Sequence, residues 1–124
     1  MQRPGTVHSF PDHLTLASRL PGIDAEALAG IADLRMSQRA LAERTGMHWH
    51  ATPQGAPTGI CHTVIREQVA LPGQVIVGTD SHTCSAGALN CLAYGVGNSE
   101  IAAVWEWNVL SVRVPRTVRV QLEG

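Results

Sequence analysis

The stretch VIVGTDSHTCSAGALNCLAYGVG, residues 75–97, gives the clearest indication of the fold. It begins within QVIVG (74–78), a continuous run rich in β-branched residues, which is typical of strands covered on both faces in a parallel sheet. Five reactive side chains follow directly after this strand: Asp80, Ser81, His82, Thr83 and Cys84. Ligands of open α/β sheets bind at the carboxyl ends of the strands. The stretch therefore predicts an α/β fold with a binding site at this strand end.

Helical and strand-like patterns alternate along the rest of the chain. Asp24 can cap a helix over 24–44, and Gly46 stands where a left-handed residue would end it. The patterns further predict helices over 60–70 and 86–92, a helix from Asn98 or Ser99 onward, and strands over 47–51 and 117–122. Alternation of this kind is typical of α/β domains.

The composition is that of one globular domain. The 124 residues are 44% hydrophobic and 15% charged, and no apolar run approaches the roughly 20 residues of a membrane span. The first ten residues, MQRPGTVHSF, lack the pattern of a secretory signal, so a cytoplasmic location is expected. With a net charge of -1 and scattered cations, the chain offers no basic face to nucleic acid.

Two residue types narrow the chemistry further. The nine cationic residues are all arginines, which excludes Schiff-base chemistry and the usual P-loop contact because both need lysine. The three cysteines, Cys61, Cys84 and Cys91, are odd in number and lie in a chain without an export signal. This argues against a disulfide framework, so we expect free thiols or ligands.

Taken one at a time, the chemistry-bearing motifs also have ordinary structural explanations. Asp12 of the Asp12-His13 pair can cap a helix, and His62 can be a partly buried structural histidine. The TDSHT segment can be an Asx turn followed by a cap. His48 and His50 point to one face of a strand and would bind a metal only with a third ligand.

The combination of these motifs, however, resembles a known family. The segment PTGICHTVIREQVALPGQVIVGTDSHTCSAGALNCLAYGVGNSEIAAV, with PDHL upstream and VRVPRTVRVQLEG downstream, is similar to the aconitase superfamily, particularly the large subunits of 3-isopropylmalate dehydratase and homoaconitase-like enzymes. The most specific parts are G-I-x-H, P-G-x-x-x-x-G-x-D-S-H-T and G-A-x-x-x-x-x-x-G-V-G. The resemblance implies a three-layer α/β/α domain with a mostly parallel sheet. Residues 1–124 would form an incomplete part of this domain, without the swivel domain.

The resemblance also implies which residues act. It implies catalytic roles for Asp12, His13, His62, Asp80 and His82, and substrate contacts for Asp80, Ser81 and His82. Asp12 and His13 would form one pair, in which the imidazole of His13 helps a hydroxyl leave as water. His62 and Asp80 would form a second pair, in which the carboxylate of Asp80 orients the imidazole of His62 and raises its basicity. The family partner of His82 is a glutamate further downstream.

The family reaction dehydrates a hydroxy acid and rehydrates it at the neighbouring carbon, with a 4Fe-4S cluster as the Lewis acid. The family's cluster cysteines, a single Cys and a Cys-x-x-Cys, lie downstream of Gly124. Cys61, Cys84 and Cys91 instead match positions of small or apolar family residues. We therefore expect no metal ligands here and no cluster bound by this chain alone.

These observations predict a segment of an aconitase-type hydro-lyase that is inactive on its own. Its substrate would be a hydroxy di- or tricarboxylic acid such as isopropylmalate, homocitrate or citrate. Its other expected partners are the rest of the large subunit and a small swivel subunit. The alternative is a cluster-free α/β remnant, or a module that binds a dicarboxylate or a partner subunit.

Overall fold

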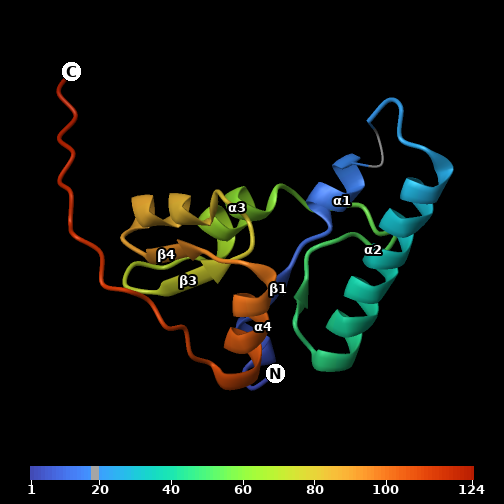
Figure 1. Cartoon of the computed structure of the whole chain (residues 1–124), viewed down its shortest axis with the longest axis horizontal. Helices are drawn as coiled ribbons and strands as arrows, with labels where there is room; N and C mark the ends of the chain where they lie inside the picture. The colour runs from blue at the N-terminus through green and yellow to red at the C-terminus, as the bar shows by residue number, and fades with distance from the viewer. Residues whose placement is uncertain (18–19) are drawn as a thin grey trace.

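The structure is a computed structural model that describes residues 1–17 and 20–124 (Figure 1). Its elements are, in chain order, η1 (Pro4–Thr6), β1 (His8–Ser9), α1 (Asp12–Ala17), α2 (Ala25–Thr45), β2 (His48–Trp49), α3 (Cys61–Val64), η2 (Ile65–Val69), β3 (Val75–Gly78), η3 (Thr83–Leu89), β4 (Leu92–Gly95) and α4 (Asn98–Trp107). The 3-10 helices are η1 and η3, and η2 is a π-helical turn that continues α3. The α/β class expected from the sequence is therefore confirmed.

Helix α2 begins and ends at the expected residues. The side chain of Asp24 accepts a hydrogen bond from the backbone N–H of Ala27 at 2.7 Å, which caps the first turn. Gly46 ends the helix with φ 76°, a left-handed conformation that glycine adopts without steric cost. From the middle of α2, Gln38 donates hydrogen bonds to the hydroxyl of Ser9 and the carbonyl of Phe10. These bonds hold α2 against the segment that leads into α1.

Strands β1 and β2 form a short parallel pair with His8 opposite His48 and Ser9 opposite Trp49. The strand expected over 47–51 is thus only two residues long. The pairing continues through the N–H of His50, which donates to the carbonyl of Ser9 at 3.0 Å. This fixes the chain just before Asp12, the first residue of α1.

Strands β3 and β4 form a second parallel pair, with register from Val75 opposite Leu92 to Gly78 opposite Gly95. The 3-10 helix η3 packs against both strands, and in Figure 1 it lies along one side of the pair. The helix expected over 86–92 is present only in part: a 3-10 helix, η3, covers Thr83–Leu89 and is capped by Asn90, whose φ of 59° is left-handed, and Leu92 begins β4. The short LAYG segment carries little β-branched character, so its strand depends on pairing with β3.

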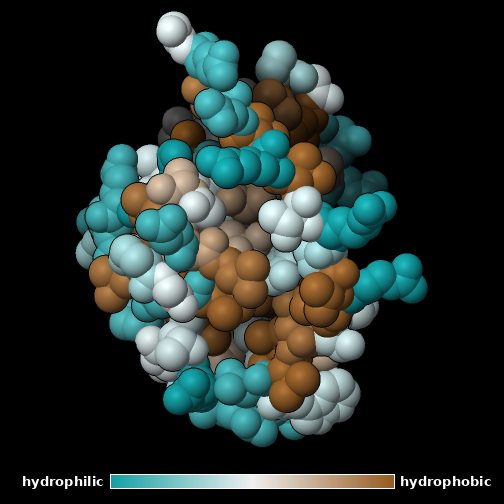
Figure 2. All heavy atoms as spheres, turned by 90° about the vertical axis from the view of Figure 1, so that its left-hand side faces the viewer, coloured by the Kyte–Doolittle hydropathy of each residue, from teal (hydrophilic) through white to brown (hydrophobic). Residues whose placement is uncertain are grey.

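The strands of the described residues, 1–17 and 20–124, are all in parallel pairs but form two separate two-stranded sheets. The expected single sheet is therefore not present in this part of the structure. Figure 2 shows apolar side chains gathered on the side of the molecule that carries β3 and β4. Val75 of β3 and Leu92 of β4 are paired large apolar residues that are 62% and 55% exposed.

The strand expected over 117–122 was also wrong. Residues 109–124 form neither helix nor strand, and Figure 1 shows this segment running away from the rest of the molecule. Its alternating Val118, Val120 and Leu122 are 80%, 77% and 92% exposed. Alternation supplies an apolar face, but a strand also needs a neighbour that takes its backbone hydrogen bonds. Across the described residues, none of the helices is both long and apolar enough to cross a membrane.

Candidate functional site

The turn that follows β3 fixes the position of Asp80. Thr83 donates two hydrogen bonds to the carbonyl of Asp80, from its hydroxyl at 2.6 Å and from its backbone N–H at 3.1 Å. A Cβ atom on Gly78 would lie 2.7 Å from the hydroxyl oxygen of Thr83. Glycine at this position therefore allows Thr83 to pack under the strand end and hold the turn.

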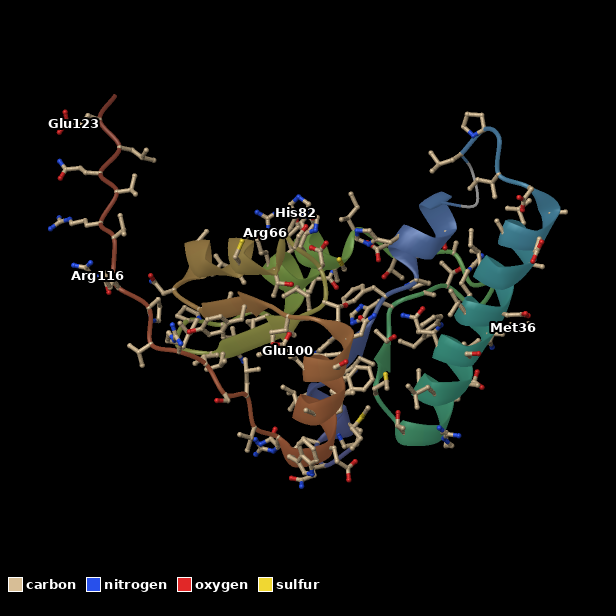
Figure 3. All side chains as sticks on the ribbon, viewed as in Figure 1. Met36, Arg66, His82, Glu100, Arg116 and Glu123 are labelled. Carbon is tan, nitrogen blue, oxygen red and sulfur yellow. The ribbon has the colours of Figure 1, made fainter. Side chains whose placement is uncertain are left out.

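Three imidazoles gather around the carboxylate of Asp80. Nδ1 of His62 lies 3.1 Å from Oδ2, which also accepts the backbone N–H of His82 at 3.0 Å. On the other side, Nδ1 of His82 lies 3.5 Å and Nε2 of His13 3.6 Å from Oδ1. Figure 3 labels His82 at the exposed edge of this group. The structure thus brings His13, His62 and His82 to one carboxylate.

The contact with Asp80 decides which nitrogen of His62 holds the proton. An ionised carboxylate only accepts hydrogen bonds, so Nδ1 of a neutral His62 is the donor and Nε2 carries the lone pair. The ring of His62 stacks on the ring of His82 with centroids 4.7 Å apart. Because the side chain of His62 is 22% exposed and that of His82 is 66% exposed, both rings are accessible from the solvent side.

Charge and hydrogen bonding keep Asp80 ionised. Burial alone would raise its pKa, but hydrogen bonds from the side chain and backbone of His82, with the positive charge of His62 and His82, outweigh burial. The pKa of Asp80 therefore lies below its ordinary value. The carboxylate is available to orient imidazoles at neutral pH.

Asp12 joins the first helix of the chain to α3. Its Oδ2 accepts the backbone N–H of Cys61 at 2.9 Å and lies 3.1 Å from Nδ1 of His13. Ile60, the residue before α3, provides no side-chain cap, so Asp12 caps that helix from 49 positions away. The residue is only 3% exposed. Burial alone would raise the pKa of Asp12, but the hydrogen bond from the N–H of Cys61 and the contact with His13 outweigh burial, so this pKa lies below its ordinary value.

The three cysteines lie in different surroundings. Burial, followed by the negative charges of Asp12 and Asp80, raises the pKa of the Cys61 thiol to about 12. The thiols of Cys84 and Cys91 donate to the carbonyls of Ser81 and Leu71, at 3.7 Å and 3.2 Å. In the part of the chain that the structure describes, the side-chain groups spaced to hold a metal ion are Asp12–His13–Cys61 and Cys61–His62–Asp80. Each of these two groups contains Cys61 and neither of the other two cysteines.

These side chains line one end of a broad open cleft of about 1570 Å³. The polar end contains Asp12, His13, Cys61, His62, Asp80 and Ser81. The remaining walls come from the N-terminal segment and from β3 and α4, which contribute apolar residues such as Ile76, Ile101 and Trp105. Small-molecule sites measure roughly 300–1,000 Å³, so a hydroxy acid bound at the polar end would fill only part of this cleft.

The sequence pattern did not identify two features of this region. Cys61 lies among the site residues, a position indicated only by its place beside His62. His8, His48 and His50 form a second imidazole group at β1 and β2, in which Nδ1 of His8 lies 2.8 Å from Nε2 of His50. The alternation of His48 and His50 had indicated part of this group, but the contribution of His8 depends on the parallel pairing of the two strands.

Comparison with known proteins gives consistent results over most of the chain. The model of the Aconitase family (aconitate hydratase) matches residues 21–124. The 3-isopropylmalate dehydratase large subunit of Desulfitobacterium hafniense is 36% identical over 115 residues, which are 92% of this chain and 25% of that protein. The corresponding subunit of Methanoregula boonei is 34% identical over 103 residues, 82% of this chain and 24% of that protein.

A shorter match is closer in sequence. The 3-isopropylmalate dehydratase large subunit 1 of Methanopyrus kandleri is 49% identical over 67 residues, which are 53% of this chain and 16% of that protein. The chain thus spans at most 25% of the length of these three relatives.

Proposed function

Because the chain belongs to the aconitase family, we propose that it is a segment of the large subunit of a hydro-lyase of the 3-isopropylmalate dehydratase kind. The reaction is the removal of water from a hydroxy acid and its return at the neighbouring carbon. The observation that carries the proposal is the carboxylate of Asp80 with three imidazoles around it, at the polar end of a cleft. The chain works within a longer subunit and is inactive alone.

The side chains around Asp80 have complementary roles in this proposal. His62 presents the lone pair of Nε2, and its bond to Asp80 stabilises the ring when it takes up a proton. His13 lies between Asp12 and Asp80, and its exposed ring gives a proton to the leaving hydroxyl, which departs as water. In the reverse addition these transfers run backwards.

The substrate class follows from the polar groups at the strand end. A hydroxy di- or tricarboxylic acid such as isopropylmalate, homocitrate or citrate presents carboxylates to the hydroxyl of Ser81 and the imidazole of His82. Both groups are accessible, and Ser81 lies within 3.4 Å of Nδ1 of His82. Asp80 completes the contacts by accepting from the substrate hydroxyl. The apolar walls of the cleft suit a substrate with an alkyl group.

The 4Fe-4S cluster implied by the family does not fit the residues of this chain. Cys61 is the single thiol in the metal-spaced groups of the described residues, whereas a cluster of this kind is held by several thiolates. We place the cluster ligands in the rest of the large subunit. The rest of that subunit also completes a three-layer α/β/α domain, and a small swivel subunit covers the substrate. The cytoplasmic location stays a prediction.

A chimeric enzyme tests the proposal. These 124 residues would replace the matched segment of the Methanoregula boonei subunit, assembled with its small subunit and assayed with isopropylmalate, homocitrate and citrate. Turnover of one of these acids is expected, and His62→Gln should lower kcat by about 10²–10⁴-fold. Cys91→Ser, outside the site, is the matched control. A folded, assembled chimera without turnover of any of the three acids would contradict the proposal and favour a binding module.

A further inference from the structure

A sulfur, a nitrogen and an oxygen donor meet beside the strand end. The donor atoms of Cys61, His62 and Asp80 all lie within 4.8 Å of one another. The sulfur of Cys61 is 4.0 Å from Nδ1 of His62, and this nitrogen is 3.1 Å from Oδ2 of Asp80. These three side chains come from two different segments that the fold brings together.

The spacing of these donors is close to that of a tetrahedral metal site. Zinc binds sulfur at about 2.3 Å and nitrogen or oxygen at about 2.0–2.2 Å, so neighbouring ligand atoms stand about 3.3–3.6 Å apart. The contacts of 4.0 Å and 3.1 Å at Nδ1 of His62 bracket this range, and the sulfur of Cys61 lies within 4.8 Å of a carboxylate oxygen of Asp80. Movements of up to about 1 Å would therefore bring the three donor atoms to corners of a tetrahedron.

We propose that Cys61, His62 and Asp80 bind a single Zn²⁺ ion, with the fourth position open to the cleft. Thiolate, imidazole and carboxylate are the three ligand types that zinc takes in proteins. This is one ion held by a single thiolate with an imidazole and a carboxylate, and it differs in its ligands from an iron–sulfur cluster, which is held by several thiolates. The open position accepts water or a carboxylate of a small ligand.

The charges around the donors favour a cation. The carboxylates of Asp80 and buried Asp12 both lie close to the thiol of Cys61 and disfavour a free thiolate there. A divalent cation reverses this effect, because its charge offsets the thiolate and both carboxylates. The described partners of Asp80 are imidazoles and a backbone N–H group. No arginine is among them that would compete with a metal ion for this carboxylate.

Binding changes the protons of two ligands. The thiol proton of Cys61 goes to solvent. His62 changes tautomer: the metal takes the place of the proton on Nδ1, and the ring carries its proton on Nε2 instead. The bond between His62 and Asp80 is then lost. If the proposed hydro-lyase role is correct, bound zinc and the acid–base pair exclude each other. The binding itself rests on the donor geometry and not on that role.

Cobalt substitution tests the site directly on the 124-residue chain. Titration with Co²⁺ should give one ion per chain, the visible bands of tetrahedral cobalt and a sulfur-to-cobalt charge-transfer band in the near ultraviolet. Cys61→Ser should abolish that band and weaken Zn²⁺ binding at least about 10-fold. The double variant Cys84→Ser/Cys91→Ser keeps Cys61 and should leave both unchanged. An unchanged charge-transfer band in Cys61→Ser would overturn the proposal.

A second pair of variants distinguishes the two possible ligand groups, since Cys61 belongs to both. His62→Gln should weaken Zn²⁺ binding at least about 10-fold, whereas His13→Gln should leave it nearly unchanged. Loss in His13→Gln with retention in His62→Gln would move the ion to the group of Asp12, His13 and Cys61 and refute the assignment. Circular dichroism of each variant checks that the fold is intact.

Discussion

Nδ1 of His62 lies 3.1 Å from Oδ2 of Asp80, although the two residues are 18 positions apart in the sequence. The contact joins the first turn of α3 to the end of β3. It fixes the tautomer of His62, because the carboxylate can only accept. The lone pair of Nε2 is then directed away from Asp80.

The first prediction concerns this tautomer. At a pH where the rings are neutral, nitrogen chemical shifts should report His62 with its proton on Nδ1. Asp80→Asn replaces the carboxylate with an amide that can also donate, so the Nδ1-protonated fraction of His62 should fall. His48, whose Nε2 contacts the carbonyl of Gly5 at 3.1 Å, is a control and should not change. An unaltered His62 in Asp80→Asn would mean that this contact does not select the tautomer.

The second prediction concerns the cap that Asp12 provides to α3. Asp12→Ala leaves the N–H of Cys61 without its partner and should lower the free energy of unfolding by about 1–3 kcal/mol. Asp12→Asn keeps an acceptor oxygen and should cost less. Chemical denaturation at neutral pH measures both variants. Equal stability of Asp12→Ala and the unchanged chain would show that water replaces the carboxylate.

The same carboxylate makes stability depend on acid. The pKa of Asp12 is below its ordinary value of 3.8, so the unfolded chain binds this proton at a higher pH than the folded chain. The contribution of Asp12 is therefore complete above that ordinary value and is lost as the pH falls through the lowered pKa. In Asp12→Asn this part of the acid dependence should be absent. An identical decline in both proteins would contradict the prediction.

Local signals in the sequence were sufficient for the elements that local interactions form. The bounds of α2 follow from a capping aspartate at one end and a left-handed glycine at the other, Asp24 and Gly46. The run 74–78 similarly predicted β3. By contrast, β4 depends on pairing with β3, and residues 117–122 have the pattern of a strand without a partner in the structure. Pairing between distant segments is not encoded in the period of either one.

The candidate site also has parts that local sequence signals predict and parts that depend on contacts between distant segments. The group at the end of β3 was visible as a run of polar residues after an apolar strand, and the resemblance to a family supplied the spacing of His62 from Asp80. The contact of Asp12 with Cys61 was not predicted, because it joins residues 49 positions apart through a backbone N–H. A backbone donor has no signature in the sequence, so only the fold shows which carboxylate it meets.

The third prediction is a pH dependence set by His8. Burial, with the positive charges of His48 and His50, lowers the pKa of His8 from 6.5 to about 4. Between these values the unfolded chain binds a proton that the folded chain does not, so stability should fall as the pH falls. One group contributes at most about 1.4 kcal/mol per pH unit, and solvent around the partly exposed ring reduces this.

Urea denaturation between pH 4 and 7 measures this dependence, since the window is bounded by the lowered and ordinary pKa values of His8. His8→Gln should flatten the curve. Gly87→Ala, with no atom within 4 Å of the added Cβ, is the control and should retain the slope. If His8→Gln and the unchanged chain have the same slope, the stacked imidazoles at β1 and β2 are not its source.

The fourth prediction tests how the fold holds Asp80. A Cβ at Gly78 would lie 2.7 Å from the hydroxyl oxygen of Thr83, so Gly78→Ala must displace the side chain that bonds to the carbonyl of Asp80. We expect a loss of about 1–3 kcal/mol in the free energy of unfolding. Gly87→Ala, with no atom within 4 Å of the added Cβ, is the matched control and should be nearly neutral. The displacement should also change the nitrogen shifts of His62 in Gly78→Ala alone. If both alanine variants are equally stable and His62 is unaltered in each, Thr83 can move without shifting Asp80, and the close approach at the strand end does not position the site.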